Sequence, residues 1–375
     1  MDPHSVFCPN PDCPASGQVN KGNIGVHSRV ERRYRCHLCE RTFVARHGTA
    51  LYRLRTDEVR VRQVVTLLAY GCPMAAVVQA FELDERTVRD WWQRAGQQCR
   101  AVHPHVRAAH PLDLQQVQAD EIRVRTQRGV YWMALAIMVS TRLWLGGVVS
   151  AHRDADLIAA LVGQVRQWAR CRPLLLAVDG LNTYVNAFQR AFRSRLPRQG
   201  VSGRSVLVAW PNVAIVQVVK QHLADRLTID RRLIQGTPDQ VAELIRTSQG
   251  QGGINTAYIE RLNATFRQRL SALMRRTRAL ARQPQTSLTA GMYVVGCLYN
   301  LCAFHESLRL KLSVGRYSYR WVQRTPALAA GLTDHRWTVA ELLTYRVPPP
   351  PWRPHRGRQG RWSKATHALV ERWAT

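Results

Sequence analysis

Between about residue 112 and residue 219, the chain alternates apolar runs with amphipathic segments in an order that few folds can accommodate. Three apolar runs come first, and their short polar connections predict three consecutive antiparallel strands. A helix, a short buried strand, a second helix and a last strand follow, so the region favours an α/β fold with a mixed five-stranded sheet. The predicted strands are 114–124, 130–140, 144–150, 174–178 and 213–219, and the predicted helices are 154–169 and 183–192.

This order of elements is similar to that of the ribonuclease-H-like fold, and we therefore expect an α/β core of that kind at 112–310. In a three-strand meander followed by a helix, the fourth strand lies beside the first. Asp120 in the first strand and Asp179 at the end of the fourth would then be neighbours, although they lie far apart in the sequence.

Three acidic residues stand out in a chain that has 25 acidic residues and a net charge of +29. Asp120 and Asp179 lie in predicted strands or at their ends, and Glu260 lies in a helix predicted at 255–278. Three converging carboxylates would repel one another unless divalent cations neutralise them. Two Mg²⁺ or Mn²⁺ ions held in this way can drive phosphoryl transfer on a nucleic-acid backbone. The predicted catalytic metal ligands are Asp120, Asp179 and Glu260.

Glu121 directly follows Asp120, and alternation along a strand sends these two side chains to opposite faces. We therefore expect only one of them in the site. Asp120 is favoured because Gln118 and Ile122 share its face, whereas Glu121 shares a face with Arg123. Taken singly, each acidic residue is equally consistent with a capping or salt-bridged surface residue.

Two pairs of cysteines near the N-terminus predict a zinc ribbon at 1–50, with strands between the pairs. A segment this short has little core, so Zn²⁺ would supply much of its folding free energy. The first pair has four intervening residues instead of the usual two, so His37 and His47 are alternative ligands, and four unrelated reduced cysteines are the other reading. The predicted zinc ligands are Cys8, Cys13, Cys36 and Cys39.

Residues 57–100 predict a helix-turn-helix DNA-binding domain, with helices at 57–69, 74–81 and 85–94. Asp84 has the position of an N-cap for the third helix. An ordinary three-helix bundle with a basic face is the alternative. The histidines and prolines at 103–111 indicate a linker. The side chains predicted to face outward and contact DNA are Arg86, Thr87, Arg89 and Arg94.

After residue 219, we expect an irregular polar stretch at 220–253, the helix at 255–278 and another apolar helix at 288–304. The helix at 255–278 has an apolar stripe on one side and arginines on the others. Arg261 and Arg267, on the same helix as Glu260, are placed to hold phosphates of a bound strand. Residues 311–375 predict a basic C-terminal extension that is partly disordered.

The charge of the whole chain favours a polyanionic partner, because Lys and Arg number 54 and the pI is about 11.1. No segment has the roughly 18 uncharged apolar residues of a membrane helix, so no membrane partner is expected. The N-terminus does not resemble a secretion signal. Free cysteines outside the two pairs fit a reducing compartment, and we expect a cytoplasmic protein.

Three stretches resemble the bacterial insertion-sequence DDE transposases, closest to the insertion-sequence-one type. They are V-Q-A-D-E-I, A-V-D-G-L-N-T-Y and the run I-N-T-A-Y-I-E-R-L-N-A-T-F-R-Q-R-L. The third is the most specific, because its glutamate, arginine and asparagine match the family helix at Glu260, Arg261 and Asn263. A further segment, R-T-P-A-L-A-A-G-L-T-D-H-R-W, is also similar to one common in such transposases.

The resemblance implies a transposase that binds the terminal repeats of its element and catalyses metal-dependent strand cleavage and strand transfer. It implies Asp120, Asp179 and Glu260 as the catalytic triad, with Tyr184 and Asn263 supporting the site or contacting DNA. Its partners would be double-stranded DNA, at element ends and target, and further copies of the chain, as a homodimer or higher oligomer on bacterial nucleoid DNA. A catalytically silent DNA-binding regulator and a ribonuclease-H-like nuclease are the alternatives.

Overall fold

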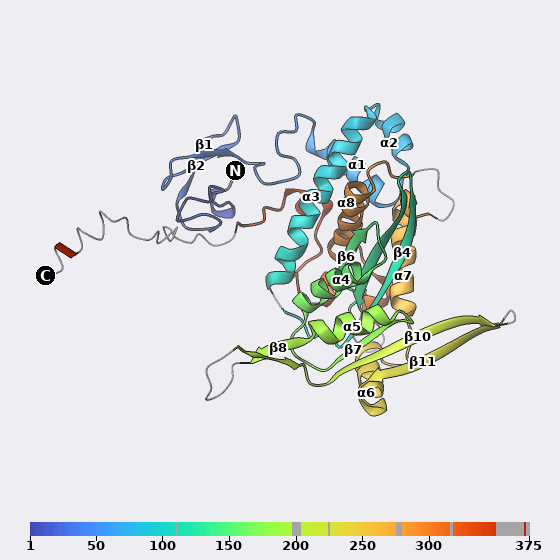
Figure 1. Ribbon diagram of the computed structural model, residues 1–375. Coiled ribbons are helices and arrows are strands. Elements are labelled where there is room, and N and C mark those ends of the chain that lie inside the picture. The colour runs from blue at the N-terminus through green and yellow to red at the C-terminus, as the bar shows by residue number, and fades with distance from the viewer. Residues whose placement is uncertain are drawn as a thin grey trace. The chain divides into compact units, whose positions relative to one another are not determined.

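The computed structural model describes residues 1–109, 111–196, 204–223, 226–274, 280–315, 318–349 and 371–372 (Figure 1). The chain forms two compact units. One comprises Met1–Gly48 with Arg346–Thr375, and the other comprises Thr49–Tyr345. The segments predicted as a helix-turn-helix and as a catalytic core therefore share one compact unit. Their functional division at 57–100 and 112–310 stays a prediction.

The first unit contains the short helix η1 (Pro3–Ser5) and a three-stranded antiparallel sheet. Its strands are β1 (Ile24–Ser28), β2 (Arg33–Cys36) and β3 (Thr42–Val44), so strands do lie between the two cysteine pairs. The small core contains Val6, Ile24, Tyr34 and Phe43 beside buried cysteines. Arg346 also belongs here and donates to the carbonyl of Ala45.

The second unit is built on a mixed six-stranded sheet in the order β11-β10-β7-β4-β5-β6. β7 is parallel to both β4 and β10, and the other neighbours are antiparallel. The three-strand meander and the position of the fourth predicted strand beside the first are confirmed. The strands are β4 (Gln116–Thr126), β5 (Gly129–Met138), β6 (Trp144–Ser150), β7 (Leu174–Asp179), β10 (Val213–Leu223) and β11 (Arg226–Gln235).

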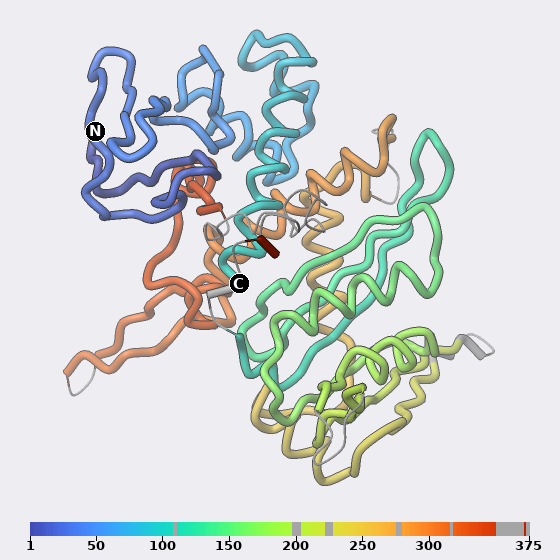
Figure 2. The backbone as a smooth tube through the Cα atoms, turned by 60° about the vertical axis from the view of Figure 1, so that its left-hand side comes forward, coloured from blue at the N-terminus to red at the C-terminus, as the bar shows by residue number. Residues whose placement is uncertain are grey.

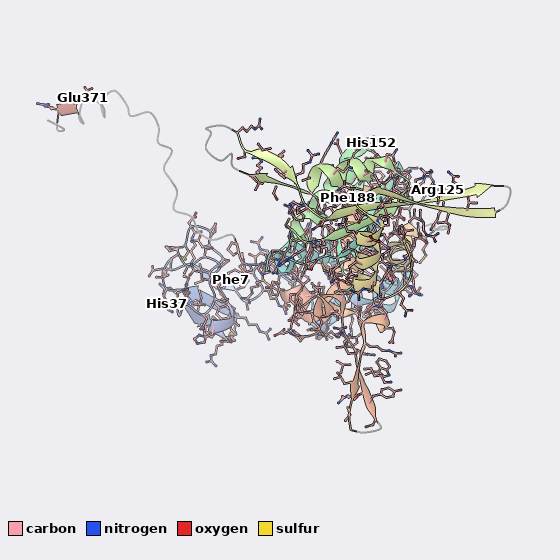
Figure 3. The ribbon with its side chains drawn as sticks, turned by 90° about the horizontal axis from the view of Figure 1, so that it is seen from below. Phe7, His37, Arg125, His152, Phe188 and Glu371 are labelled. Atoms are coloured by element: carbon pink, nitrogen blue, oxygen red, sulfur yellow. The ribbon has the colours of Figure 1, made fainter. Side chains whose placement is uncertain are left out.

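The expected count of five strands is wrong, because 220–253 is not irregular. β10 continues to Leu223, β11 pairs with it, and helix α6 (Pro238–Gln249) follows. Much of this two-stranded ribbon extends beyond the sheet, as Figures 1 and 3 show. The end of β10 and all of β11 are therefore rich in polar residues and lack the apolar pattern of a buried strand. A small hairpin of β8 (Arg193–Leu196) and β9 (Val206–Ala209) also escaped prediction.

Helices cover both faces of the sheet. The helices α4 (Ala155–Trp168) and α5 (Asn182–Ala191) pack together on one face (Figure 1). On the other lie α6, α7 (Ala257–Arg269) and α8 (Pro284–Cys297). α7 is shorter than the predicted 255–278, because it ends at Arg269 and a 3₁₀ turn, η2 (Ser271–Leu273), follows. The predicted arginines at 275–278 lie outside the described residues. α8 continues into a one-turn π-helix, η3 (Leu298–Cys302).

The predicted helices at 57–69 and 74–81 are confirmed as α1 (Glu58–Ala69) and α2 (Met74–Phe81). The third helix, α3 (Glu85–Ala109), is much longer than predicted and includes Pro104, so the linker predicted at 103–111 is wrong up to residue 109. Packing explains the difference, since α3 runs along α8. A side chain at Gly96 would meet Ala290 at 2.5 Å, so the glycine permits this close approach. Interhelical burial outweighs the backbone bond that Pro104 cannot make.

Part of the predicted C-terminal extension is ordered. A hairpin of β12 (Leu310–Ser313) and β13 (Tyr319–Val322), orange in Figure 2, is followed by α9 (Pro326–Ala329) and α10 (Val339–Thr344). Leu342 and Leu343 of α10 are buried. The arginines predicted in the tail at 353–361 lie outside the described residues.

One helical stretch, Pro284–Leu308, is long and apolar enough to cross a membrane by length and composition, although the sequence suggested none. Its most apolar 18-residue window has a mean hydropathy of 1.4, and 72% of that window is buried inside the protein. This burial is typical of a core helix.

The buried His103 on α3 makes stability dependent on pH. Its ring packs against Trp144, Trp168 and Tyr293, and its Nε2 is buried without a partner among the described residues. The pKa of His103 is lowered from 6.5 to about 3, mainly by burial and also by the charge of Arg107, while a hydrogen bond to the Trp144 backbone opposes the change. The folded state therefore holds the ring neutral, whereas the unfolded chain takes up a proton below pH 6.5.

We predict that the neutral His103 ring contributes its full share to the free energy of unfolding above pH 6.5. This contribution is lost as pH falls toward 3, by up to about 1.4 kcal/mol per pH unit. Urea unfolding of wild type and His103→Phe between these limits measures it. The variant should lose less stability on acidification. Parallel curves for the two proteins would show that His103 does not carry the effect.

Candidate metal centre

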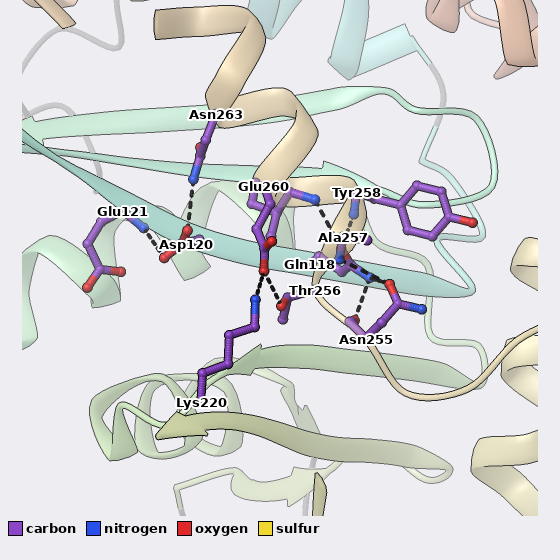
Figure 4. Close-up of polar contacts among 11 residues, drawn as sticks. Gln118, Asp120, Glu121, Lys220, Asn255, Thr256, Ala257, Tyr258, Glu260 and Asn263 are labelled. Atoms are coloured by element: carbon purple, nitrogen blue, oxygen red, sulfur yellow. Dashed lines mark hydrogen bonds and ion pairs between the residues drawn. The ribbon is translucent and has the colours of Figure 1, made fainter. Parts of the chain in front are cut away.

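The first turn of α7 is held against the sheet by one buried side chain of β4, Gln118. Its Oε1 accepts hydrogen bonds from the backbone N–H groups of Tyr258 and Ile259, both at 3.0 Å, and its Nε2 donates to the carbonyl of Asn255 at 2.8 Å (Figure 4). Thr256, the N-cap residue, gives no side-chain cap. Gln118 therefore satisfies helix N–H groups that would otherwise lack partners, and it fixes where α7 meets β4.

Asp120 lies two residues further along β4, on the same face as Gln118, and it meets the next turn of α7. Asn263 Nδ2 donates to Asp120 Oδ2 at 2.8 Å, and the amide of Glu121 donates to Oδ1 at 2.8 Å (Figure 4). The structure thus joins Asp120 to the asparagine of the third sequence motif.

Asp179 ends β7 next to Asp120. The parallel register pairs Ala119 with Val178, so the two aspartates follow at the point where pairing of β4 with β7 stops. One carboxylate oxygen from each of Asp120, Glu121 and Asp179 lies within 4.8 Å of the others. The predicted proximity of Asp120 and Asp179 is therefore found.

The expectation that only one of Asp120 and Glu121 reaches the site is wrong. Their side chains do leave opposite faces of β4, since Glu121 meets the side of α4 and α5. There Tyr184 of α5 donates to Glu121 Oε2 at 2.8 Å, and Arg153, just before α4, forms an ion pair with Oε1. The carboxylates still converge, because the pairing of β4 with β7 stops at Ala119 and Val178, just before Asp120, Glu121 and Asp179.

Glu260 lies on the α7 face that carries Asn263, but it is outside this three-residue group. It forms an ion pair with Lys220 of β10 and accepts from Thr256 Oγ1 at 2.7 Å (Figure 4). About half of its side chain, 47%, is exposed. Glu260 is thus adjacent to the acidic group and available from solvent, with Lys220 as its present counter-ion.

The electrostatics of the group favour a cation. The pKa of Asp120 is raised to about 6, mainly by burial and also by the negative charges of Glu121, Asp179 and Glu260, while the hydrogen bond from the amide of Glu121 opposes the rise. Burial also tends to raise the pKa of Glu260, but hydrogen bonds from Lys220 and Thr256 outweigh it and lower that pKa. The oxygen-only donor set is the kind that Mg²⁺ and Mn²⁺ prefer.

Two basic residues of the site were missed by sequence reasoning. Arg153 contacts Glu121 and lies 3.7 Å from Asp179 Oδ2, and Lys220 neutralises Glu260. Arg153 sits in a connection without periodicity, so nothing in the sequence indicated it. Lys220 carried a signal, because it is one of only four lysines in the chain.

The predicted DNA-contacting residues differ in exposure. Arg86 and Arg89 are exposed on α3, although Arg89 forms an ion pair with Glu85. Thr87 is half-buried. Arg94 is also half-buried and bonds to Asp90 Oδ2 at 2.7 Å and to the Tyr52 carbonyl at 3.0 Å.

The predicted DNA-contacting residues on α7 also differ in exposure. Arg261 is exposed, Arg267 is half-buried and Asn263 is buried.

The four N-terminal cysteines converge in the first unit. Their sulfur atoms all lie within 4.8 Å of one another, with 3.5 Å between Cys8 and Cys39 and 3.9 Å between Cys13 and Cys36. A tetrahedral Zn–S₄ site with bonds of about 2.3 Å has sulfur–sulfur distances of about 3.8 Å. The sulfurs therefore fit a zinc ion, and neither His37 nor His47 belongs to the group.

Polar hydrogens directed at the sulfur of Cys36 support the same conclusion. Burial tends to raise the pKa of Cys36, but backbone N–H groups of Cys39 and Leu38 and the side chain of Asn23 outweigh it and lower the pKa to about 7. Asn23 Nδ2 lies 3.3 Å from Cys36 Sγ. The thiolate form of Cys36, which is the form that binds metal, is thus stabilised before any metal binds.

Comparison with models of known protein families finds no match for this chain, and comparison with curated proteins also finds none.

Cys36→Ser should release zinc from the first unit, because three sulfurs and a hydroxyl cannot reproduce the tetrahedral thiolate site. Metal analysis of purified protein is expected to find one zinc per chain in wild type and almost none in the variant. The matched control is Cys171→Ser, which changes an exposed cysteine outside the cluster. Equal zinc in Cys36→Ser and wild type would contradict the site.

Proposed function

We propose that this protein is a DDE-type transposase that binds the terminal repeats of an insertion sequence and cleaves and joins DNA strands. Its second unit would then contain a ribonuclease-H-like catalytic core. The observation that carries the proposal is the approach of Asp120 and Asp179 at adjacent strand positions, beside the α7 face that bears Glu260.

Asp120, Asp179 and Glu260 would hold the divalent metals, and Glu121 would act mainly by shaping the site. Both oxygens of Glu121 are already engaged, one by Tyr184 and one by Arg153, and 1% of its side chain is exposed. Glu260 is far more accessible, and its only ion-pair partner among the described residues is the partly exposed Lys220. Bound Mg²⁺ or Mn²⁺ would supply activation of an attacking oxygen and stabilisation of the leaving oxygen.

The chain's own residues would place the reacting strand. Asn263 holds one oxygen of Asp120, which leaves the carboxylate fixed in orientation. Gln118 sets the position of α7, and therefore of Glu260, against the strand that carries Asp120. The basic chain would attract the DNA backbone, with arginines of α7 near the phosphates.

The other modules would recognise DNA. Exposed Arg86 and Arg89 on α3 fit contacts to a duplex, and the zinc-binding unit would add a second contact surface. Joining two element ends requires two active sites, so a homodimer or higher oligomer on DNA is part of the proposal. A cytoplasmic, nucleoid-associated location in a bacterium follows from the same function.

Cleavage of DNA carrying the terminal repeats tests the proposal. We predict nicking with Mg²⁺ or Mn²⁺, none with EDTA, and a fall of about a hundredfold or more in Asp120→Asn, Asp179→Asn and Glu260→Gln. Asp239→Asn, which changes an exposed carboxylate on α6, is the matched control and should cleave normally. DNA binding should persist in all variants, because recognition and chemistry use different residues.

Other outcomes identify the alternatives. Specific binding of the ends without cleavage under any metal would contradict catalysis and support a silent regulator. Metal-dependent cleavage without joining of ends to target DNA would support a ribonuclease-H-like nuclease.

A further inference from the structure

A cluster of positively charged side chains lies on the opposite side of α7 from Glu260. A pocket of about 390 Å³ opens between α7, the turn that connects β5 to β6, and the end of η3. It is separate from the acidic group. The residues that the argument uses are Arg142, Tyr258, Arg261, Arg269, Tyr299 and His305.

Helical geometry explains why one helix can serve both places. At about 100° per residue, Glu260 and Asn263 point to one side of α7. Arg261 and Arg269, together with Tyr258, point to another, and all three line the pocket. A nucleic-acid strand that passes Glu260 can therefore reach the pocket by following the surface of the same helix.

The two half-buried arginines of the pocket, Arg142 and Arg269, have no acidic partner among the described residues, although Arg142 donates to the carbonyl of Val139. Burial lowers the pKa of both Arg142 and Arg269, and among the described residues no carboxylate counteracts this at either group. Arg142 stacks on the Tyr258 ring at 4.1 Å and Arg269 on the Tyr70 ring at 4.7 Å. Arg269 Nη1 is buried without a hydrogen-bond partner among those residues.

Arg142, Arg261 and Arg269 line the pocket together with Tyr299. Burial raises the pKa of Tyr299, and the charges of Arg142, Arg269 and Arg261 all oppose that rise. Burial lowers the pKa of His305, and the positive charges of Arg142 and Arg261 lower it further. The one acidic residue in the lining, Glu306, forms an ion pair with Arg309 at 3.1 Å.

Like charges gathered in a half-buried pocket repel one another unless an anion joins them. The local backbone is also unusual, because Arg142 has a φ of +59° and Tyr299 lies in a one-turn π-helix. Both features are enriched at binding sites, where surrounding structure maintains a costly conformation. The pocket thus has fixed donors, aromatic walls and an uncompensated positive charge.

We propose that this pocket binds a phosphate group of the nucleic-acid strand that is presented to the acidic centre. Guanidinium groups match phosphate oxygens with paired N–H donors, and Tyr258 and Tyr299 offer aromatic contacts to the adjoining nucleotide. The inference rests on the proposed function for the nature of the strand. It assigns Arg142, Arg269 and His305 to a site that the sequence did not indicate.

Binding of a fluorescein-labelled oligothymidylate, measured by anisotropy in EDTA over a series of NaCl concentrations, tests the proposal without catalysis. Arg261→Gln and Arg142→Gln should each weaken binding several-fold at low salt. Each should also reduce the slope of log affinity against log salt by about 0.7, the value for one phosphate contact on a single strand. Arg246→Gln removes an exposed arginine of α6 bonded to Glu243 and should retain the wild-type slope.

Arg261 is exposed, so Arg261→Gln is expected to fold. This variant decides the result even if Arg142→Gln fails to fold. Wild-type affinity and slope in a folded Arg261→Gln would overturn the assignment. Displacement of the oligonucleotide by inorganic phosphate or thymidine monophosphate at equal phosphate concentration would also overturn it, in favour of a small-molecule pocket. If the variants bind the oligonucleotide more weakly but the wild type cleaves no DNA, the phosphate-binding role of the pocket is supported and the proposed function is contradicted.

Discussion

The contact between Gln118 and the first turn of α7 positions everything else in the candidate site. One buried amide accepts from two N–H groups of the helix and donates to the carbonyl before it. Loss of these bonds would leave buried polar groups without partners, each at a cost of about 1–3 kcal/mol. Because the bonds act at the start of α7, they fix the direction in which all its side chains project. Asn263 therefore meets Asp120 one turn later, and Arg261 and Arg269 reach a separate pocket.

The second constraint is charge. Although the chain has a net charge of +29, only Arg153 forms ion pairs with the acidic group among the described residues, and Lys220 pairs with the neighbouring Glu260. They neutralise Glu121 and Glu260, respectively, whereas Asp120 is left with a hydrogen bond from Asn263 and a pKa raised to about 6. The carboxylates are thus held together at an electrostatic cost that a divalent ion would relieve. The basic pocket on α7 likewise holds charges of one sign close together, here positive, and a bound phosphate would relieve their repulsion.

The parts of this architecture that follow from local pattern were predictable. The strand order placed Asp179 next to Asp120, and cysteine spacing identified the four converging thiols. Features that depend on packing were not. Pro104 indicated a linker, but burial against α8 keeps α3 helical through it, and β11 carries too few buried apolar residues to be recognised. Alternation along β4 correctly sent Glu121 to the other face, but it could not show that the end of β7 lets the carboxylates meet. Arg142 and Arg269 became informative only when tertiary structure showed that they lack acidic partners.

The central claim is that Asp120 and Asp179 form a divalent-metal site, and calorimetric titration of Mn²⁺ into the zinc-loaded protein with duplex DNA tests it most directly. Wild type should bind Mn²⁺, and Asp120→Asn and Asp179→Asn should lose that binding while retaining zinc. Asp230→Asn, which changes an exposed carboxylate of β11 paired with Arg232, should bind as wild type does. Equal Mn²⁺ binding by wild type and Asp120→Asn, or none by wild type, would contradict the account.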